Sequence, residues 1–116
     1  KVILLGAGAN GSLVLKAAKE QEAVRAAISL SPGEFFLPLL SIQDTISGIQ
    51  KPILVTSSRM ELPYIEELMS NVAEEYKTIF APENSEGERG TDALLPDNPS
   101  SSEYWLAILL FFKDLQ

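Results

Sequence analysis

The chain begins with an unbroken apolar run that leads directly into a glycine-rich turn. Residues 1–5 read KVILL, and the next six residues read GAGANG, with glycine at positions 6, 8 and 11. An apolar run without polar alternation is typical of a strand that is buried on both faces of a parallel sheet. Residues 12–20 then place leucine, valine and alanine at helical spacing. This strand, turn and helix predict an α/β fold.

The alternation of strands and helices continues along the chain. We predict further strands at residues 24–30, 53–56 and 76–81, because each is an apolar run beside prolines or turn residues. Four strands that alternate with helices predict a parallel sheet with right-handed crossovers, at the centre of a three-layer sandwich.

The sequence defines the helices after residue 30 to different degrees. An amphipathic helix is predicted from Pro63, with an apolar stripe formed by Tyr64, Ile65, Leu68, Met69 and Val72. Residues 34–50 predict only a short or broken helix with a loop. Residues 103–115 predict a closing helix that is apolar almost all round. Between the last strand and this helix, residues 82–102 predict a long loop, and long loops in small domains are usually functional or disordered.

Composition argues against several classes of function. The 116 residues carry 16 acidic and 9 basic side chains, and the net charge of −7 disfavours nucleic acids and anionic membranes as partners. Cysteine and histidine are both absent, so this chain offers no thiolate chemistry, no imidazole base and no histidine metal ligand. The apolar runs are too short to span a bilayer. We therefore expect a cytoplasmic protein with no metal site and no cofactor.

The GAGANG turn permits a dinucleotide-binding interpretation. A strand, GxGxxG and a helix are the elements with which a Rossmann domain binds the pyrophosphate. That domain also uses an acidic residue about twenty positions later, at the end of the second strand, to hold the ribose. Here the second strand ends at Leu30 and Ser31, and the next acidic residue is Glu34, beyond a Pro-Gly turn. A Rossmann domain that uses GAGANG stays open as an alternative.

Five segments, taken in order, resemble the C-terminal half of an α/β-hydrolase, the fold of esterases and dienelactone hydrolases. KVILLGAGANGSLVLKAAKE is similar to the strand, nucleophile elbow and following helix, and VRAAISLSPG to the next strand and its exit. KPILVTSSRMELPYIEELM resembles the strand, acid loop and helix that follow. YKTIFAPENSEGERGTDALL resembles the last strand and histidine loop, and SEYWLAILLFFKDL the terminal helix. The resemblance implies one α/β-hydrolase-like domain over residues 1–116, with strands 5 to 8 of that fold, as the C-terminal part of a larger domain.

The catalytic triad that this resemblance implies is degenerate. The family's elbow reads GxSxG, and here Gly8 occupies the serine position while Asn10 occupies that of the second glycine. Glu61 takes the acid position, although an acid near a helix start is also favoured by the helix macrodipole. Arg89, in GERGT, takes the histidine position and stays protonated at neutral pH. The resemblance therefore implies a protein that has lost serine hydrolase activity.

A non-catalytic binding or structural module is the expected function. The amides of Gly8, Ala9 and Asn10, at a predicted helix N-terminus, would form a nest for an anion. Arg89 would lie beside this nest in the implied fold, so a small anionic ligand such as a carboxylate or phosphate would bind there. An empty structural cleft is the other possibility. An active hydrolase or esterase of the same fold, which uses residues outside this segment, is a further alternative.

A substitute nucleophile would need a nearby base. The serines expected near the carboxyl edge of the sheet are Ser12, Ser31, Ser57 and Ser58. A serine–lysine pair is a known chemistry. The candidate lysines are Lys16, Lys19 and Lys51. They are predicted on a helix face or at the start of a strand, away from that edge, so they are poorly placed to act as the base.

Two surfaces are candidates for contacts with other chain segments. The implied fold has more than four strands, so we expect a preceding segment or a partner chain to cover the strand at residues 1–5. The closing helix at residues 103–115 carries four aromatic side chains. It would either pack on the sheet or support a homo-oligomer.

Overall fold

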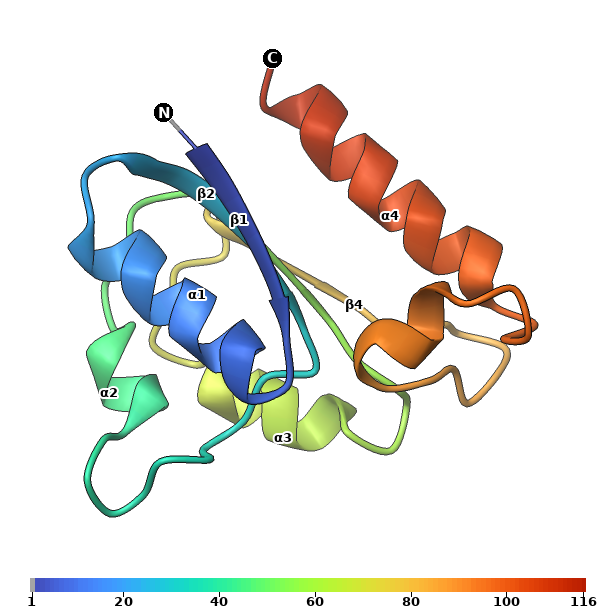
Figure 1. Cartoon of the computed structure of the whole chain (residues 1–116), viewed down its shortest axis with the longest axis horizontal. Coiled ribbons are helices and arrows are strands. Elements are labelled where there is room, and N and C mark those ends of the chain that lie inside the picture. Colours follow the sequence, from blue (N-terminus) through green and yellow to red (C-terminus); the bar gives the residue numbers. More distant parts are fainter. Residues whose placement is uncertain (1) are drawn as a thin grey trace.

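The computed structural model describes residues 2–116 and contains a four-stranded parallel sheet with helices on both of its faces (Figure 1). The strands, which neighbour one another in sequence order, are β1 (Val2–Ala7), β2 (Val24–Leu30), β3 (Ile53–Thr56) and β4 (Lys77–Phe80). The helices are α1 (Ala9–Glu20), α2 (Ile42–Thr45), α3 (Leu62–Leu68), the short 3-10 helix η1 (Gly90–Leu94) and α4 (Ser101–Asp114). The predicted α/β class is therefore confirmed.

The strand order explains which face of the sheet each helix covers. Each strand is added on the same side of the one before it, and right-handed crossovers that step in one direction keep their helices on one face. Helices α1, α2 and α3 accordingly share one face. Helix α4, which follows the last strand, covers the other face (Figure 1).

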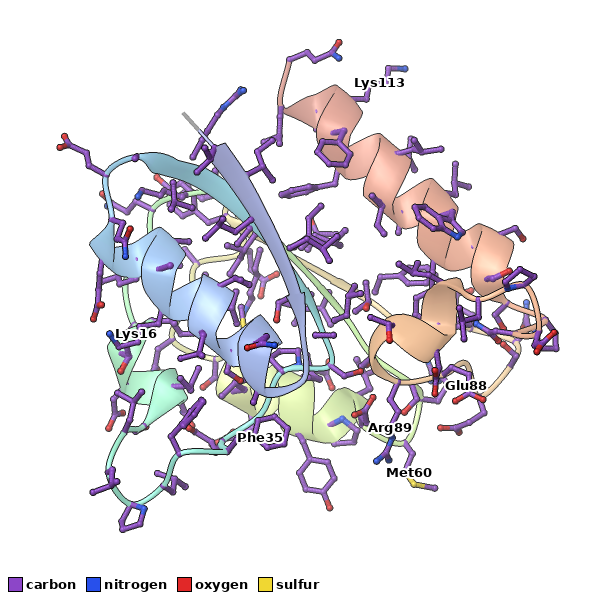
Figure 2. All side chains as sticks on the ribbon, in the orientation of Figure 1. Lys16, Phe35, Met60, Glu88, Arg89 and Lys113 are labelled. Atoms are coloured by element: carbon purple, nitrogen blue, oxygen red, sulfur yellow. The ribbon has the colours of Figure 1, made fainter. Side chains whose placement is uncertain are left out.

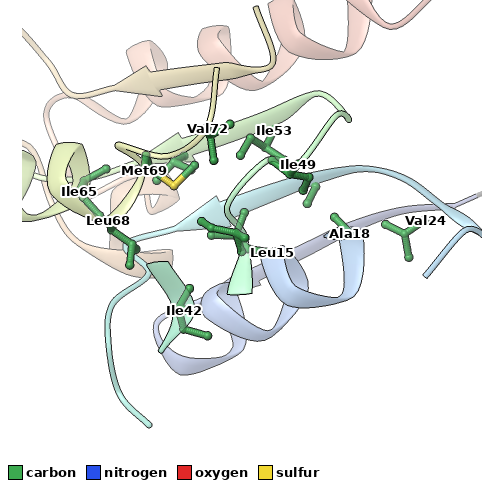
Figure 3. Packing of buried hydrophobic residues seen from close by; sticks show 13 residues of the cluster. Leu15, Ala18, Val24, Ile42, Ile49, Ile53, Ile65, Leu68, Met69 and Val72 are labelled. Carbon is green, nitrogen blue, oxygen red and sulfur yellow. The ribbon is translucent and has the colours of Figure 1, made fainter. Parts of the chain in front are cut away.

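The side chains of the central strands alternate between two hydrophobic cores. On β2, Ala27 contributes to the core under α1 to α3, while Ala26 and Ile28 contribute to the core under α4. The register continues this alternation across the sheet, since Ala27 is paired with Ile53 and Ile28 with Leu54. Figure 3 shows the larger core, whose labelled residues are Leu15, Ala18, Val24, Ile42, Ile49, Ile53, Ile65, Leu68, Met69 and Val72. Burial on both faces explains why β2 and β3 are mostly apolar, with Arg25 of β2 as the exposed exception.

Strand β1 lies at one edge of the four-stranded sheet. Its apolar run predicted a neighbour on each side, with the second one supplied by a preceding segment or a partner chain, and among the described residues β2 is its one neighbour. Val2 and Leu5 are consequently 49% and 51% exposed. Leu4 still packs against the core under α1. The partial exposure of β1 follows from its position at the sheet edge, since its residues are apolar.

The element boundaries agree best in the middle of the sheet. Strands β2 and β3 have the predicted bounds, α1 starts three residues earlier than predicted, and the loop at residues 82–102 contains η1. The predicted stripe of α3 is wrong at Tyr64, which is 78% exposed. A helix of seven residues buries one narrow face, and Ile65 and Leu68 occupy it. In residues 2–116, none of the helices is long and apolar enough to cross a membrane.

Candidate functional site

The residues after the four strands meet in one open pocket of about 340 Å³ at the carboxyl edge of the sheet. Ligands of open α/β sheets bind at this edge. The pocket is lined by Ala7, Gly8, Ser31, Phe35, Glu61, Arg89, Gly90, Thr91 and Asp92. All three predicted triad positions, Gly8, Glu61 and Arg89, are therefore in one place. Figure 2 shows Phe35, Met60 and Arg89 at the same end of the molecule.

Gly8 turns the chain from β1 into α1 with an unusual backbone. Its φ is 58° and its ψ is −128°, a combination that side-chain-bearing residues adopt only under strain. A Cβ atom added to Gly8 would have no atom within 4 Å, so the space that a side chain would fill is open. The turn is thus a sharp strand-to-helix elbow that glycine adopts freely and that has no side chain at its tip.

Gly6 permits the close approach of strand and helix at this elbow. A Cβ atom on Gly6 would lie 2.7 Å from the carbonyl oxygen of Asn10, and Gly11 would similarly meet the Ser29 hydroxyl at 2.7 Å. The Asn10 carbonyl belongs to the backbone, so packing requires glycine at position 6. The Ser29 hydroxyl is the end of a side chain and can rotate, so the firmer limit at Gly11 is the backbone carbonyl oxygen of Gly6, 3.2 Å from an added Cβ. Both glycines lie where strand and helix pack closely.

The backbone amides at the start of α1 are only partly available to a ligand. The amide of Gly8 donates to the carbonyl oxygen of Leu30 at 2.9 Å, so the expected nest loses this donor. The first intrahelical bond runs from Ser12 to Gly8, which leaves Ala9 and Asn10 without acceptors within the helix. Ala9 and Asn10 are exposed, but neither residue lines the pocket that contains Arg89. The residue before them, Gly8, does line this pocket.

Glu61 is held firmly on the floor of the pocket. Its Oε1 atom accepts hydrogen bonds from the Ser58 amide at 3.0 Å, the Ser58 hydroxyl at 3.2 Å and the Ser31 hydroxyl at 2.9 Å. Its Oε2 atom lies 3.9 Å from Nε of Arg89. The carboxylate therefore has one saturated oxygen and one oxygen that faces the guanidinium.

Arg89 reaches over the pocket from the loop that follows β4. Its side chain is 65% exposed, whereas that of Glu61 is 20% exposed, so their ion pair is largely solvated. Such pairs add little stability, at most about 1 kcal/mol. The guanidinium carries several N–H groups, which can donate to a ligand. Asp92, which also lines the pocket, adds a second carboxylate.

Ser31 joins the loops around the pocket, a role that the sequence did not reveal. Among the described residues it is the one non-glycine residue with a positive φ, 55°. Its hydroxyl donates to Glu61 and accepts from the amide of Gly90 at 2.8 Å. One side chain thus ties the exit of β2 to the acid loop after β3 and to η1 after β4. The sequence placed Ser31 near the carboxyl edge of the sheet, before a Pro-Gly turn, but did not indicate these bonds.

Tyr104 of α4 fixes the loop that carries Arg89. It is fully buried, its hydroxyl donates to the carbonyl oxygen of Ser57 at 2.7 Å, and it accepts from the amide of Glu88 at 3.2 Å. Its ring stands edge-on to Phe80, with the centroids 5.1 Å apart. The residue before Arg89 is therefore anchored to the sheet through α4.

Tyr104 gives the chain a pH-dependent stability. Burial raises the pKa of its hydroxyl above the usual value of 10.0, so the unfolded chain releases this proton at lower pH than the folded chain. The stabilisation by Tyr104 is complete below about pH 10 and decreases as the pH rises further. We expect Tyr104→Phe to cost about 1–3 kcal/mol at pH 7, and the difference from wild type to shrink above pH 10, in urea unfolding experiments. Tyr64→Phe is the control and should change stability by less than about 0.5 kcal/mol at pH 7.

The substitute serines and lysines do not form a catalytic pair. Lys16 pairs with Glu20, and Lys19 and Lys51 donate to backbone carbonyls of Ser47 and Gln21. Figure 2 shows Lys16 on the outer side of α1. In residues 2–116, no group of three or more His, Cys, Asp or Glu side chains could hold a metal ion.

Comparisons of the chain with protein-family models, with curated proteins and with solved structures return no match. The function has therefore to be argued from the pocket itself.

Proposed function

We propose that the chain is an α/β-hydrolase-like module without serine hydrolase activity, which binds a small anionic ligand at the elbow. The backbone of Gly8 carries this proposal, because a strand-to-helix turn in this conformation, with open space at its tip, is where that fold displays its nucleophile. The strand order, and the pocket shared by Gly8, Glu61 and Arg89, support the same assignment.

The chemistry of these three positions favours binding over hydrolysis. Ester hydrolysis of this type needs a hydroxyl to attack the carbonyl carbon and a base to take its proton. Glycine supplies no hydroxyl, and the permanently charged guanidinium of Arg89 takes no proton. What remains is a charged donor at a pocket that Gly8 also lines, and the exposed residues Ala9 and Asn10 follow Gly8 at the start of α1. A carboxylate or phosphate oxygen is the ligand group that fits these donors.

The strand order argues against the dinucleotide alternative. A Rossmann domain places its first strand in the interior of the sheet, and the ligand lies where the strand order reverses. Here all described strands follow β1 in one direction, so β1 lies at an edge and the order does not reverse. At the end of β2, where a Rossmann domain has the acidic residue that holds the ribose, this chain has Ser31. An active hydrolase that draws residues from outside this segment remains the second candidate, since Ala9 would supply one oxyanion amide.

Substitutions of the two charged residues should change anion affinity in opposite directions. We expect Arg89→Ala to weaken acetate and phosphate binding about fivefold or more, because the charged donor is lost. Glu61→Gln should strengthen it a few-fold, because the carboxylate 3.9 Å from Arg89 competes with the anion. Amide shifts of Gly8, Ala9 and Gly90 in NMR titrations measure both effects.

Arg59→Ala is the matched control for this titration. Arg59 is an exposed arginine of the loop after β3 that does not line the pocket, and its replacement removes the same charge. Its loss should leave the affinity nearly unchanged. Equal weakening by Arg59→Ala and Arg89→Ala would mean that only net charge matters, and the proposed site would be lost.

A further inference from the structure

Helix α4 carries a second stripe beside the one that packs on the sheet. The inner stripe contains Tyr104, Ile108 and Phe111, which are all buried. On a different face, Glu103, Leu106, Leu110 and Lys113 follow one another at steps of three, four and three residues, which align side chains along a helix. All four are exposed, Leu106 by 55% and Leu110 by 50%. The stripe is therefore apolar in its middle and oppositely charged at its two ends.

Part of this stripe lies along the free edge of the sheet. Glu103, Leu106 and Leu110 line a groove of about 400 Å³ together with Asp114 of α4 and with Ile79 and Phe80 of β4, whereas Lys113 lies outside its lining. Strand β4 has β3 as its one neighbour among the described residues. The opposite edge is β1, so a segment that covers β1 would leave this groove open.

The charges on the stripe select the orientation of an occupant. Glu103 and Lys113 are equally far from Ile108 along the helix, and so are Leu106 and Leu110. A two-fold axis perpendicular to α4, at the level of Ile108 but on the side of the stripe, therefore brings Leu106 against Leu110 of an antiparallel copy. The same axis brings Glu103 against Lys113 of that copy, twice. A parallel arrangement would instead place Glu103 against Glu103, which is repulsive.

We propose that a second copy of this chain docks antiparallel on α4, with Leu106 against Leu110 and Glu103 against Lys113. The contact is isologous, as in most two-fold dimers. Fourteen residues of helix extend for only about 21 Å, so the helix alone buries less than the roughly 800 Å² per partner of a standard interface. The net charge of −7 on each copy adds a repulsion that salt screens. The dimer is accordingly weak and forms at high protein concentration.

Loss of the apolar contact tests the surface. Sedimentation experiments on the whole chain, over a wide concentration range, should show reversible dimers for the wild type and monomers for Leu106→Glu. Leu39→Glu is the control, because Leu39 is 95% exposed in the loop before α2 and lies far from the stripe in sequence. Circular dichroism confirms that each variant is folded. A wild type that stays monomeric at all concentrations, or a Leu106→Glu variant that still dimerises, overturns the proposal.

A charge exchange tests the antiparallel register. Glu103→Lys and Lys113→Glu should each weaken dimerisation about fivefold to tenfold, because each replaces two attractive contacts with two repulsive ones. The double variant Glu103→Lys with Lys113→Glu restores opposite charges and should dimerise as the wild type does. A double variant that is as weak as the single ones overturns the proposed register. Acetate binding at Arg89 is the independent measure of the pocket, so the two proposals can fail separately.

Discussion

Gly87→Ala is expected to lower the free energy of unfolding by about 2–4 kcal/mol. Gly87 has a φ of 74°, where an alanine is strained. An added Cβ would collide with the Tyr104 hydroxyl and would lie 2.9 Å from Cδ of Pro82. Both neighbours are fixed, Tyr104 by burial and Pro82 by its ring, so overpacking adds to the backbone strain. The thermal midpoint should fall by about 10 °C or more.

Gly90→Ala provides the matched control for this substitution. Gly90 lies three residues later in the same loop and also has a positive φ, 58°, but an added Cβ would meet only Ala7, at 3.9 Å. Its replacement should cost about 1 kcal/mol, through backbone strain alone. Similar losses for the two variants would show that the packing of Gly87 against Tyr104 does not hold the Arg89 loop.

The fold could be predicted where local pattern and burial coincide. The bounds of β2 and β3 followed from apolar runs beside turn residues, because both strands are buried on two faces. Tyr64 was misplaced because a short helix has a narrower buried face than its apolar spacing indicates. The exposure of Val2 and Leu5 follows from strand order, which the apolar pattern of β1 does not encode. The edge position itself was expected from the resemblance, which predicts that a preceding segment or a partner chain covers β1.

The sequence could predict that the three candidate residues lie close together, but not the hydrogen bonds that hold them there. Gly8, Glu61 and Arg89 each follow a strand, so parallel strands bring them to one edge of the sheet. The bonds that hold them there cross long stretches of sequence, since Ser31 reaches Gly90 and Tyr104 reaches Glu88. Such pairings depend on loop conformations that a single sequence does not specify.

The order of the loop at residues 82–102 also depends on contacts that the sequence did not reveal. Its length indicated a function, and Arg89 and Asp92 do line the pocket. However, its order comes from Tyr104 and from Asn98, whose side-chain amide donates to the carbonyl oxygen of Ala93 at 2.8 Å. These contacts make a polar, glycine-rich segment part of the domain. A loop of this composition is otherwise typical of disorder.

Restoring both missing groups should create a reactive serine at the elbow. We expect Gly8→Ser combined with Arg89→His to react with a fluorophosphonate at least about a hundredfold faster than either single variant, because the base then activates the nucleophile. The wild type should not react, and it should not hydrolyse p-nitrophenyl esters. Glu61, held by Ser31 and Ser58, would orient the introduced histidine. The space above Gly8 accommodates the introduced hydroxyl.

Two further variants decide whether such a gain arises from a triad. Gly8→Ala with Arg89→His keeps the histidine and the backbone strain but removes the hydroxyl, so labelling should disappear. Adding Glu61→Gln to the reactive double variant keeps hydrogen-bond acceptance from Ser58 but removes the charge that stabilises an imidazolium, so the rate should fall. The strain of a side chain at a φ of 58° costs about 1–3 kcal/mol, and circular dichroism must show that each variant still folds. A folded double variant no more reactive than the single ones would mean that Gly8 does not occupy a nucleophile position, and the hydrolase-like assignment would be wrong.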